Sequence, residues 1–146
     1  NQIQPPVRPK RLKNYEEIDE LFQKFYDKYL KGKSVLEMTK TIRAKIIYKK
    51  IKGANPIWTG LSTMSGSCVV HAEMLNKALE LAGIESMVIT NTGGYHSWVL
   101  VKENGKWRHY DPTPGEHAIG PLTDAQKHYA PGIGNLYWNS SYPKAQ

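Results

Sequence analysis

The stretch HSWVLVKENGKWRHYDPTPG, residues 96–115, decides the fold of this chain. At its centre lies Asn104-Gly105, a pair that strongly signals a two-residue β-hairpin turn. On either side, residues 96–102 and 106–110 are rich in β-branched and aromatic residues, as strands usually are. Residues 111–115 then break regular structure with two prolines and a glycine. We therefore predict two antiparallel strands over 96–102 and 106–110.

The length of this turn determines which side chains of the hairpin meet. With a two-residue turn, Glu103 pairs with Lys106. Counting along both strands then places Trp98 opposite Asp111. His96 and Asp111 become diagonal neighbours on one face, about 7–8 Å apart along the backbone, a gap that their side chains can close. A slip of one residue would place them on opposite faces, so the predicted contact depends on the turn.

A predicted helix that begins at the only cysteine precedes this hairpin. Ser67 and Cys68 stand before apolar residues at helical spacing, and Gly83 supplies a stop signal. After the helix, residues 86–90 are predicted to form a strand, and Gly93-Gly94 a turn. We therefore expect a helix that carries the cysteine at its N-terminus and packs on an antiparallel sheet. The apolar stripe of this helix is predicted to contain Ala72, Leu75, Leu79 and Ala82.

The predicted position of Cys68 favours a reactive thiol. The unpaired N–H groups and the macrodipole at a helix N-terminus favour the thiolate, which is the nucleophilic form. Gly66 and Ser67 would let a substrate approach closely, and the Cys68 N–H could donate to an oxyanion. A single cysteine excludes an intramolecular disulfide and an all-cysteine zinc site. On this evidence alone, a small buried hydrophobe is an equally good interpretation of Cys68.

His96 and Asp111 are candidates for activating this thiol. A nucleophilic cysteine needs a base, and the base needs a third group that fixes its tautomer and orientation. As single residues, His96 could be a surface histidine and Asp111 the start of a turn. His71, one helical turn after Cys68, is a rival base, and His109 is interpreted as a packing or substrate contact. The five histidines show no tight ligand spacing, so we expect no metal site.

The N-terminal third of the chain is predicted to be helical. Asn14 followed by Glu17, and Ser34 followed by Glu37, have the spacing of helix capping boxes. The first helix should end before Gly32. The second should end by Gly53, and residues 53–66 are predicted to be a loop. The buried stripe of the second helix is predicted to contain Met38, Ile42 and Ile46, with Ile51 as a candidate last member.

The composition fits one globular domain with a basic surface. The chain has 146 residues, of which 40% are hydrophobic, and a formal charge of +7. This charge allows contact with an anionic surface, but no basic-aromatic stacking motif is present, so we do not expect nucleic-acid binding. No apolar run approaches the roughly 18 residues of a membrane span. We expect residues 1–13, with three prolines, to be a linker or arm, and 14–146 to be a single, monomeric domain of a longer protein.

The motifs together resemble the core of the transglutaminase-like superfamily. They are Ser65-Gly66-Ser67-Cys68 with Ala72, then Ala82-Gly83-Ile84, His96-Ser97-Trp98, Trp107 and Asp111-Pro112-Thr113, within a region from Leu36 to Gly115. The resemblance implies an α+β, papain-like fold with N-terminal helices and a nucleophile helix on an antiparallel sheet. It also implies that Cys68 is the nucleophile, His96 the base and later the acid, and Asp111 its orienter.

The resemblance further implies a thiol enzyme that needs no cofactor. We expect cleavage or transfer of amide-linked acyl groups of proteins or peptides through a Cys68 thioester, with hydrolysis as the first choice. Cross-linking with an amine acceptor and a non-catalytic binding module on the same fold are the alternatives. The cellular compartment is not identified by the sequence, and our expectation is an extracellular or cell-envelope domain of a bacterial protein.

Two tryptophans are candidates for substrate contact. The cross-linking enzymes of eukaryotes carry an oxyanion-stabilising tryptophan well upstream of the cysteine, whereas Trp58 precedes Cys68 by only ten positions. Trp58 therefore either lines a substrate groove or covers the core. We expect Cys68 to be partly accessible in a groove that is bordered by Trp58 or Trp98.

Overall fold

A computed structural model describes residues 14–51, 53–128 and 137–146 of the chain. The predicted linker at 1–13 lies outside these residues. No helix in the described ranges is both long enough and apolar enough to cross a membrane. The elements in chain order are α1 (Tyr15–Tyr29), α2 (Val35–Lys45), β1 (Ile47–Tyr48), α3 (Pro56–Thr63), β2 (Ser65–Gly66), α4 (Cys68–Leu81), β3 (Ser86–Thr90), β4 (Ser97–Glu103), β5 (Lys106–Tyr110) and α5 (Asp124–His128).

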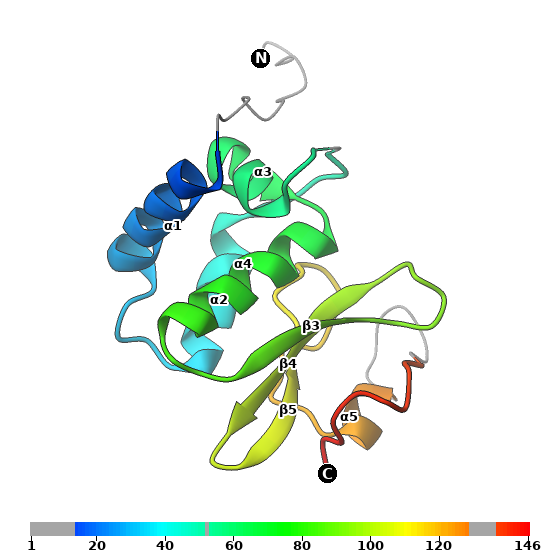
Figure 1. Ribbon diagram of the computed structural model, residues 1–146. Coiled ribbons are helices and arrows are strands. Elements are labelled where there is room, and N and C mark those ends of the chain that lie inside the picture. The colour runs from blue at the N-terminus through cyan, green and yellow to red at the C-terminus, as the bar shows by residue number, and fades with distance from the viewer. Residues whose placement is uncertain (1–13, 52, 129–136) are drawn as a thin grey trace.

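The architecture is α+β, as predicted, and α4 is its central element. Figure 1 shows α4 between the other N-terminal helices and the sheet of β3, β4 and β5. This sheet is antiparallel, with the strand order β3-β4-β5. Residues Met74, Leu75, Ala78 and Leu79 of α4 are fully buried in the main core, together with Val99 and Val101 of β4.

Both predicted helix starts in the N-terminal third are confirmed. The Asn14 side chain accepts a hydrogen bond from the Glu17 N–H at 3.0 Å and caps α1. Ser34 and Glu37 form a reciprocal capping box at the start of α2. Each cap satisfies backbone donors that the first turn of a helix leaves unpaired, which explains why these two starts could be read from the sequence.

The prediction for residues 46–66 was partly wrong. Helix α2 ends at Lys45, and Ile51 is not part of it. Instead, β1 follows at once and pairs in parallel with β2. The segment predicted to be a loop contains α3, which Asn55 caps by accepting the Trp58 N–H at 2.9 Å. Gly60 is part of α3, and the helix packs so closely on α4 at this point that a Cβ would come within 2.3 Å of the Met74 sulfur.

The hairpin has the predicted register. Asn104 and Gly105 both have positive φ, 52° and 77°, as a tight two-residue hairpin turn requires. Glu103 pairs with Lys106, and the pairing continues to Val99 opposite Tyr110. His96 lies one position before β4 rather than within it. The two strands therefore bring the segments that carry His96 and Asp111 to the same end of the sheet.

The C-terminal segment packs against the face of the sheet that α4 leaves open. Asn91 forms an isolated bridge with Trp138, and the Asp124 N–H donates to the carbonyl oxygen of Ala145 at 2.6 Å. Because both faces are covered, β4 is buried at five successive positions, Ser97 to Val101. A second small core of buried residues lies on this side and contains Ile89, Trp98, Leu100 and Ala145.

Candidate active site

Cys68 is the first residue of α4, as predicted, and its side chain is partly accessible. Ser67 precedes it with an extended backbone and no side-chain cap, so no serine hydroxyl occupies the N–H groups of the first turn. Gly66 lies so close to α4 that a Cβ would come within 2.4 Å of the Val70 Cβ. We expected Gly66 to let a substrate approach closely, but the packing of β2 on α4 already requires a glycine at this position. The close approach of β2 to α4 fixes the position of the thiol.

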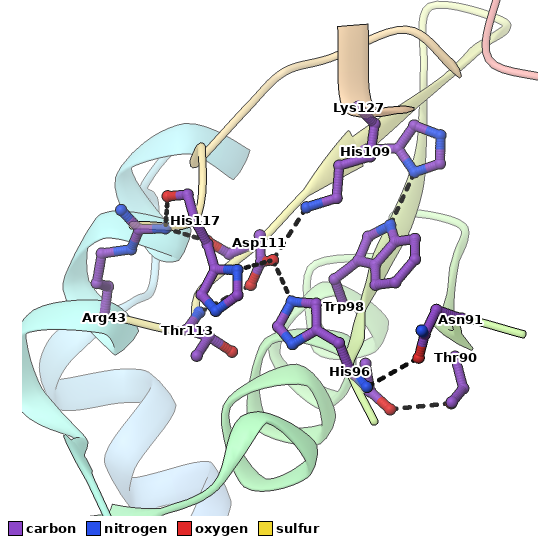
Figure 2. A network of polar contacts seen from close by, with 11 residues as sticks. Arg43, Thr90, Asn91, His96, Trp98, His109, Asp111, Thr113, His117 and Lys127 are labelled. Atoms are coloured by element: carbon purple, nitrogen blue, oxygen red, sulfur yellow. Dashed lines mark hydrogen bonds and ion pairs between the residues drawn. The ribbon is translucent and has the colours of Figure 1, made fainter. Parts of the chain in front are cut away.

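His96 forms the two contacts that the sequence predicts. Its Nε2 lies 2.6 Å from Oδ2 of Asp111, and both side chains are buried (Figure 2). The His96 side chain also lies close enough to the Cys68 side chain to lower the pKa of the thiol. Because Nε2 is engaged with Asp111, Nδ1 is the nitrogen available to the sulfur. The side chains of Cys68, His96 and Asp111 therefore form a continuous chain of contacts.

These contacts shift the pKa values of the thiol and the imidazole toward each other. Burial raises the pKa of Cys68, but hydrogen bonds from the His96 side chain and the Ser97 backbone lower it further than burial raises it. Burial lowers the pKa of His96, whereas hydrogen bonds to Asp111 and Cys68 raise it above its usual value. The net directions favour a thiolate beside an imidazolium.

Asp111 is held by donors from three parts of the chain. Its Oδ1 accepts the Thr113 N–H at 3.0 Å, and its Oδ2 accepts bonds from His96 and from the Lys127 ammonium group, the latter at 3.0 Å. Burial alone would raise the pKa of Asp111, but the hydrogen bond to His96 and the charge of Lys127 hold it well below its usual range. Asp111 is therefore an ionised, oriented carboxylate at neutral pH.

Arg43 of α2 fixes the loop that follows Asp111. Its guanidinium group donates to the carbonyl oxygens of both Asp111 and His117, each at 2.8 Å. Figure 2 shows this guanidinium beside the loop, while the His117 ring faces the site. The ends of a seven-residue loop are thus tied to one side chain, and the loop is held over His96.

A cavity of about 300 Å³ opens beside the thiol. Cys68 and His96 form part of its wall, and the loop 113–117 forms another part. Tyr48 and Tyr95 contribute the aromatic part of the lining and remain 43% and 60% exposed. A volume of this size can hold part of an extended peptide with one side chain.

The two predicted tryptophan contacts do not line this cavity. Trp98 is fully buried and stacks on His96 with 5.5 Å between ring centroids, and its Nε1 donates to Nδ1 of His109 at 2.8 Å. The expected substrate contact of Trp98 is therefore corrected to a packing contact behind His96, because β4 is covered on both faces. Trp58 lies on α3, outside the cavity lining, and its buried Nε1 has no partner in the described residues.

The other two candidate histidines have structural surroundings. Both ring nitrogens of His71 lie within hydrogen-bond distance of backbone carbonyl oxygens, those of Ser67 and Ile46, so neither is free to serve Cys68. His109 lies between Trp98 and Asp124, whose Oδ1 is 2.7 Å from its Nε2. His109 is thus a packing residue, the first of the two interpretations that the sequence allowed.

Sequence reasoning missed His117 and Lys127. The His117 ring stacks on His96 with centroids 4.1 Å apart and planes 7° from parallel. Lys127 of α5 is 2% exposed. His117 lies in a loop without periodicity, and a lysine is rarely buried, so neither residue carries a signal that pattern reasoning could have used.

Within the part of the chain that the structure describes, one set of side chains has the spacing of metal ligands. Ligand atoms of His96, Asp111 and His117 lie within 4.8 Å of one another. These donors suit a cation poorly, because Nε2 of His96 and the Lys127 ammonium group already share Oδ2 of Asp111. A positive charge at 3.0 Å from the carboxylate repels a metal ion. We therefore interpret the set as a hydrogen-bonded network.

Comparison with known proteins agrees with the fold. One similar solved structure, described as a TGase, has a TM-score of 0.55 at 16% identity over 73% of this chain and 35% of its own. Another, named "Putative Cysteine Protease from Cytophaga hutchinsonii", has a TM-score of 0.53 at 16% identity over 88% of this chain and 54% of its own. The chain thus spans about a third of the first structure and about half of the second, and no curated protein matches it. Residues 16–112, more than half of the chain, match the family model described as Transglutaminase-like superfamily, and the chain therefore belongs to this superfamily.

Proposed function

We propose that this chain is a thiol enzyme that cleaves amide bonds of proteins or peptides through a thioester on Cys68. The observation that carries the proposal is the chain of contacts from Cys68 through His96 to Asp111 at the edge of an open cavity. The family and fold support the same chemistry, but they do not choose a substrate. His96 and Asp111 have the roles of base and orienter in this proposal.

The first half of the reaction forms the thioester. The Cys68 thiolate attacks the carbonyl carbon of the amide, and the carbonyl oxygen becomes an oxyanion. The N–H of Cys68, at the start of α4, is positioned to donate to it. The C–N bond then breaks as the His96 imidazolium gives its proton to the nitrogen, and the amine leaves. Asp111 keeps the imidazole ring in place and stabilises its charged form.

The second half releases the acyl group. His96, now neutral, takes a proton from water, and the hydroxide formed attacks the thioester carbonyl. The C–S bond breaks, a carboxylic acid leaves, and the thiolate beside an imidazolium is restored. An amine in place of water would give acyl transfer through the same steps. We rank hydrolysis first because the lining residues Tyr48 and Tyr95 are exposed, so water has direct access to the thioester.

Peptide digestion in ¹⁸O-labelled water, with and without methylamine, tests the proposal. We expect new carboxyl termini that carry ¹⁸O, and no product with Cys68→Ala. N-methylamide products in excess over ¹⁸O-labelled acids would instead assign acyl transfer. Rapid alkylation of Cys68 without any product from a proteome-derived peptide library would contradict cleavage of peptide amides. Slow alkylation as well as no product would favour the non-catalytic binding module.

Cys68→Ala must also fold for this control to be valid. The substitution removes one sulfur atom from a partly accessible position at a helix start, so we expect a cost of about 1 kcal/mol in the free energy of unfolding. A thermal melt of the variant provides the check.

A further inference from the structure

A lysine that lies beyond the family match is buried against the candidate site. Lys127 of α5 is 2% exposed, and its ammonium group lies 3.0 Å from Oδ2 of Asp111 and 4.9 Å from the centroid of the Trp98 ring. The match to the family model ends at residue 112. Burying an ammonium group costs several kcal/mol unless it is paired, so the fold must hold this charge in place through its contacts.

We propose that Lys127 is a positioning residue of this site, whose ammonium group fixes the Asp111 carboxylate against His96. This inference rests on the proposed function, in which Asp111 orients the base. It adds a fourth residue to that arrangement, and it assigns a role to a helix that the family match does not include.

The geometry of the carboxylate supports this role. Oδ2 of Asp111 accepts from His96 and Lys127 at once, while Oδ1 accepts only the N–H of Thr113 among the described residues (Figure 2). Thr113 is two positions away on the same loop and would move with Asp111. Lys127 comes from a different element, so it is the contact that ties the carboxylate to the body of the fold. Without Lys127, the hydrogen bonds that limit rotation of the carboxylate would be those from the Thr113 N–H and from His96 itself.

Two side-chain contacts attach α5 to the rest of the fold. Two of its residues reach the back of the site, since Asp124 binds His109 and Lys127 binds Asp111. His109 in turn accepts the Trp98 N–H, and Trp98 stacks on His96. The helix thus supports the base by two routes, one through the carboxylate and one through the stacked rings.

The charges around the site also depend on Lys127. Before the attack, the proposed site contains a thiolate, an imidazolium and a carboxylate, and the Lys127 ammonium group brings the sum of their charges to zero. Its charge lowers the pKa of His96, opposite to the effect of Asp111. Lys127 therefore keeps Asp111 ionised while limiting how strongly Asp111 holds the proton on His96.

Three other ionisable residues lie near the site, but none of them brings a positive charge into contact with the Asp111 carboxylate. Arg43 binds the carbonyl oxygen of Asp111 rather than its carboxylate. His117 has a pKa lowered to about 4, first by burial, so it is neutral at pH 7. Asp124 is paired with His109 behind Trp98. Besides the base His96, Lys127 is thus the charged group among these residues that contacts the Asp111 carboxylate directly.

The test compares Lys127→Met with Lys77→Met. Methionine keeps much of the length and apolar volume of lysine but has no charge. Lys77 serves as the matched control, because its ammonium group pairs with Asp19 at 2.7 Å between α4 and α1, away from the cavity. An NMR titration of the imidazole follows His96 in each variant. We expect Lys127→Met to raise the pKa of His96, because the charge of Lys127 lowers it, and Lys77→Met to leave it unchanged.

A purely structural role would lower the melting temperature of Lys127→Met without moving the titration of His96, and this result would overturn the inference. If Lys127→Met does not fold, the wild-type protein still provides a test. The ¹⁵N resonance of the Lys127 ammonium group should then shift in step with the titration of His96. A resonance that is independent of that titration would also overturn the inference.

Failure of this inference and failure of the proposed function give different results. The titration of His96 requires no substrate, so it tests the positioning role even if no product is found. With a cleavable peptide, Lys127→Met should lower kcat at least about tenfold with little change in KM, because Lys127 does not line the cavity. A wild-type kcat in Lys127→Met, with a shifted His96, would contradict the role in catalysis.

Discussion

The imidazole of His117 lies flat on the imidazole of His96, with 4.1 Å between their centroids. Two stacked imidazolium rings would repel each other, and this arrangement therefore requires that one ring be neutral. Burial, followed by the charges of His96, Lys127 and Arg43, lowers the pKa of His117 to about 4 despite the opposing effect of Asp111. His117 is then the neutral ring, which leaves His96 free to carry the proton.

This pairing makes the stability of the fold depend on pH. A histidine whose pKa is lowered by folding stabilises the native state fully above its unfolded value of about 6.5, and this stabilisation is lost as the pH falls toward the folded value. The pKa values of His117 and His109 are both lowered to about 4, whereas that of His96 is raised, which has the opposite effect. We expect a net fall in melting temperature between pH 6.5 and pH 4. His117→Phe, which keeps the stack but cannot titrate, should make this fall smaller, and an unchanged pH dependence would refute the assignment.

The reactivity of the thiol should also depend on pH in a way that reveals its partner. Because hydrogen bonds from His96 and Ser97 lower the pKa of Cys68, alkylation by iodoacetamide should stay fast well below the ordinary thiol pKa of about 8.5. In His96→Ala the alkylation rate should fall as the pH drops below about 8.5. The chain has a single cysteine, so the rate reports on one site. Identical profiles for the two proteins would show that His96 does not stabilise the thiolate.

Removing the Asp111 charge should affect both turnover and stability. We expect Asp111→Asn to lower turnover roughly 10²–10⁴-fold, since nucleophile and base remain but the base is no longer held in place. The same change leaves the Lys127 ammonium group buried beside a neutral amide, which should cost about 3–5 kcal/mol in the free energy of unfolding. Denaturant titration of the two single variants and of Asp111→Asn with Lys127→Met measures the coupling. The double variant should be more stable than Asp111→Asn alone, and strictly additive losses would contradict the ion pair.

The close contact between β2 and α4 predicts an effect of a single methyl group. A Cβ at Gly66 would come within 2.4 Å of the Val70 Cβ, which is bonded to the backbone of the helix and cannot swing aside. We expect Gly66→Ala to cost about 1–3 kcal/mol in the free energy of unfolding. Val70→Ala removes the two Cγ atoms at 2.5 Å but keeps the Cβ, so its combination with Gly66→Ala should not restore wild-type stability. Thermal melts provide the measurement, and a stable Gly66→Ala protein with unchanged alkylation of Cys68 would disprove the constraint.

Local signals explain which parts of the fold could be predicted. The capping residues Asn14 and Ser34 act within one helical turn, and Asn104-Gly105 sets the register of both strands that it joins. The contact between His96 and Asp111 follows from that register. For this reason, two of the three candidate residues could be placed together from the sequence, and the third from the start of a helix.

The remaining features depend on contacts between distant segments. The parallel pairing of β1 with β2 involves two residues on each strand and leaves no periodic pattern. Helix α3 was missed because Gly60 reads as a loop residue until Met74 of α4 is packed against it. Trp98 was expected at the groove because the burial of both faces of β4 depends on the C-terminal segment. Lys127 is buried only because Asp111 lies opposite to it.

The placement of α5 has a practical consequence for work with shorter pieces of this protein. A fragment that ends at residue 115 would contain Cys68, His96 and Asp111 and all of the region that matches the family. It would lack the residues that cover the second face of the sheet, so the largest aromatic side chain of β4, Trp98, would be exposed to water. Such a fragment should aggregate or melt at a lower temperature even though every residue of the proposed reaction is present. Expression trials should therefore retain the chain through Ala145, whose carbonyl oxygen receives the N–H of Asp124.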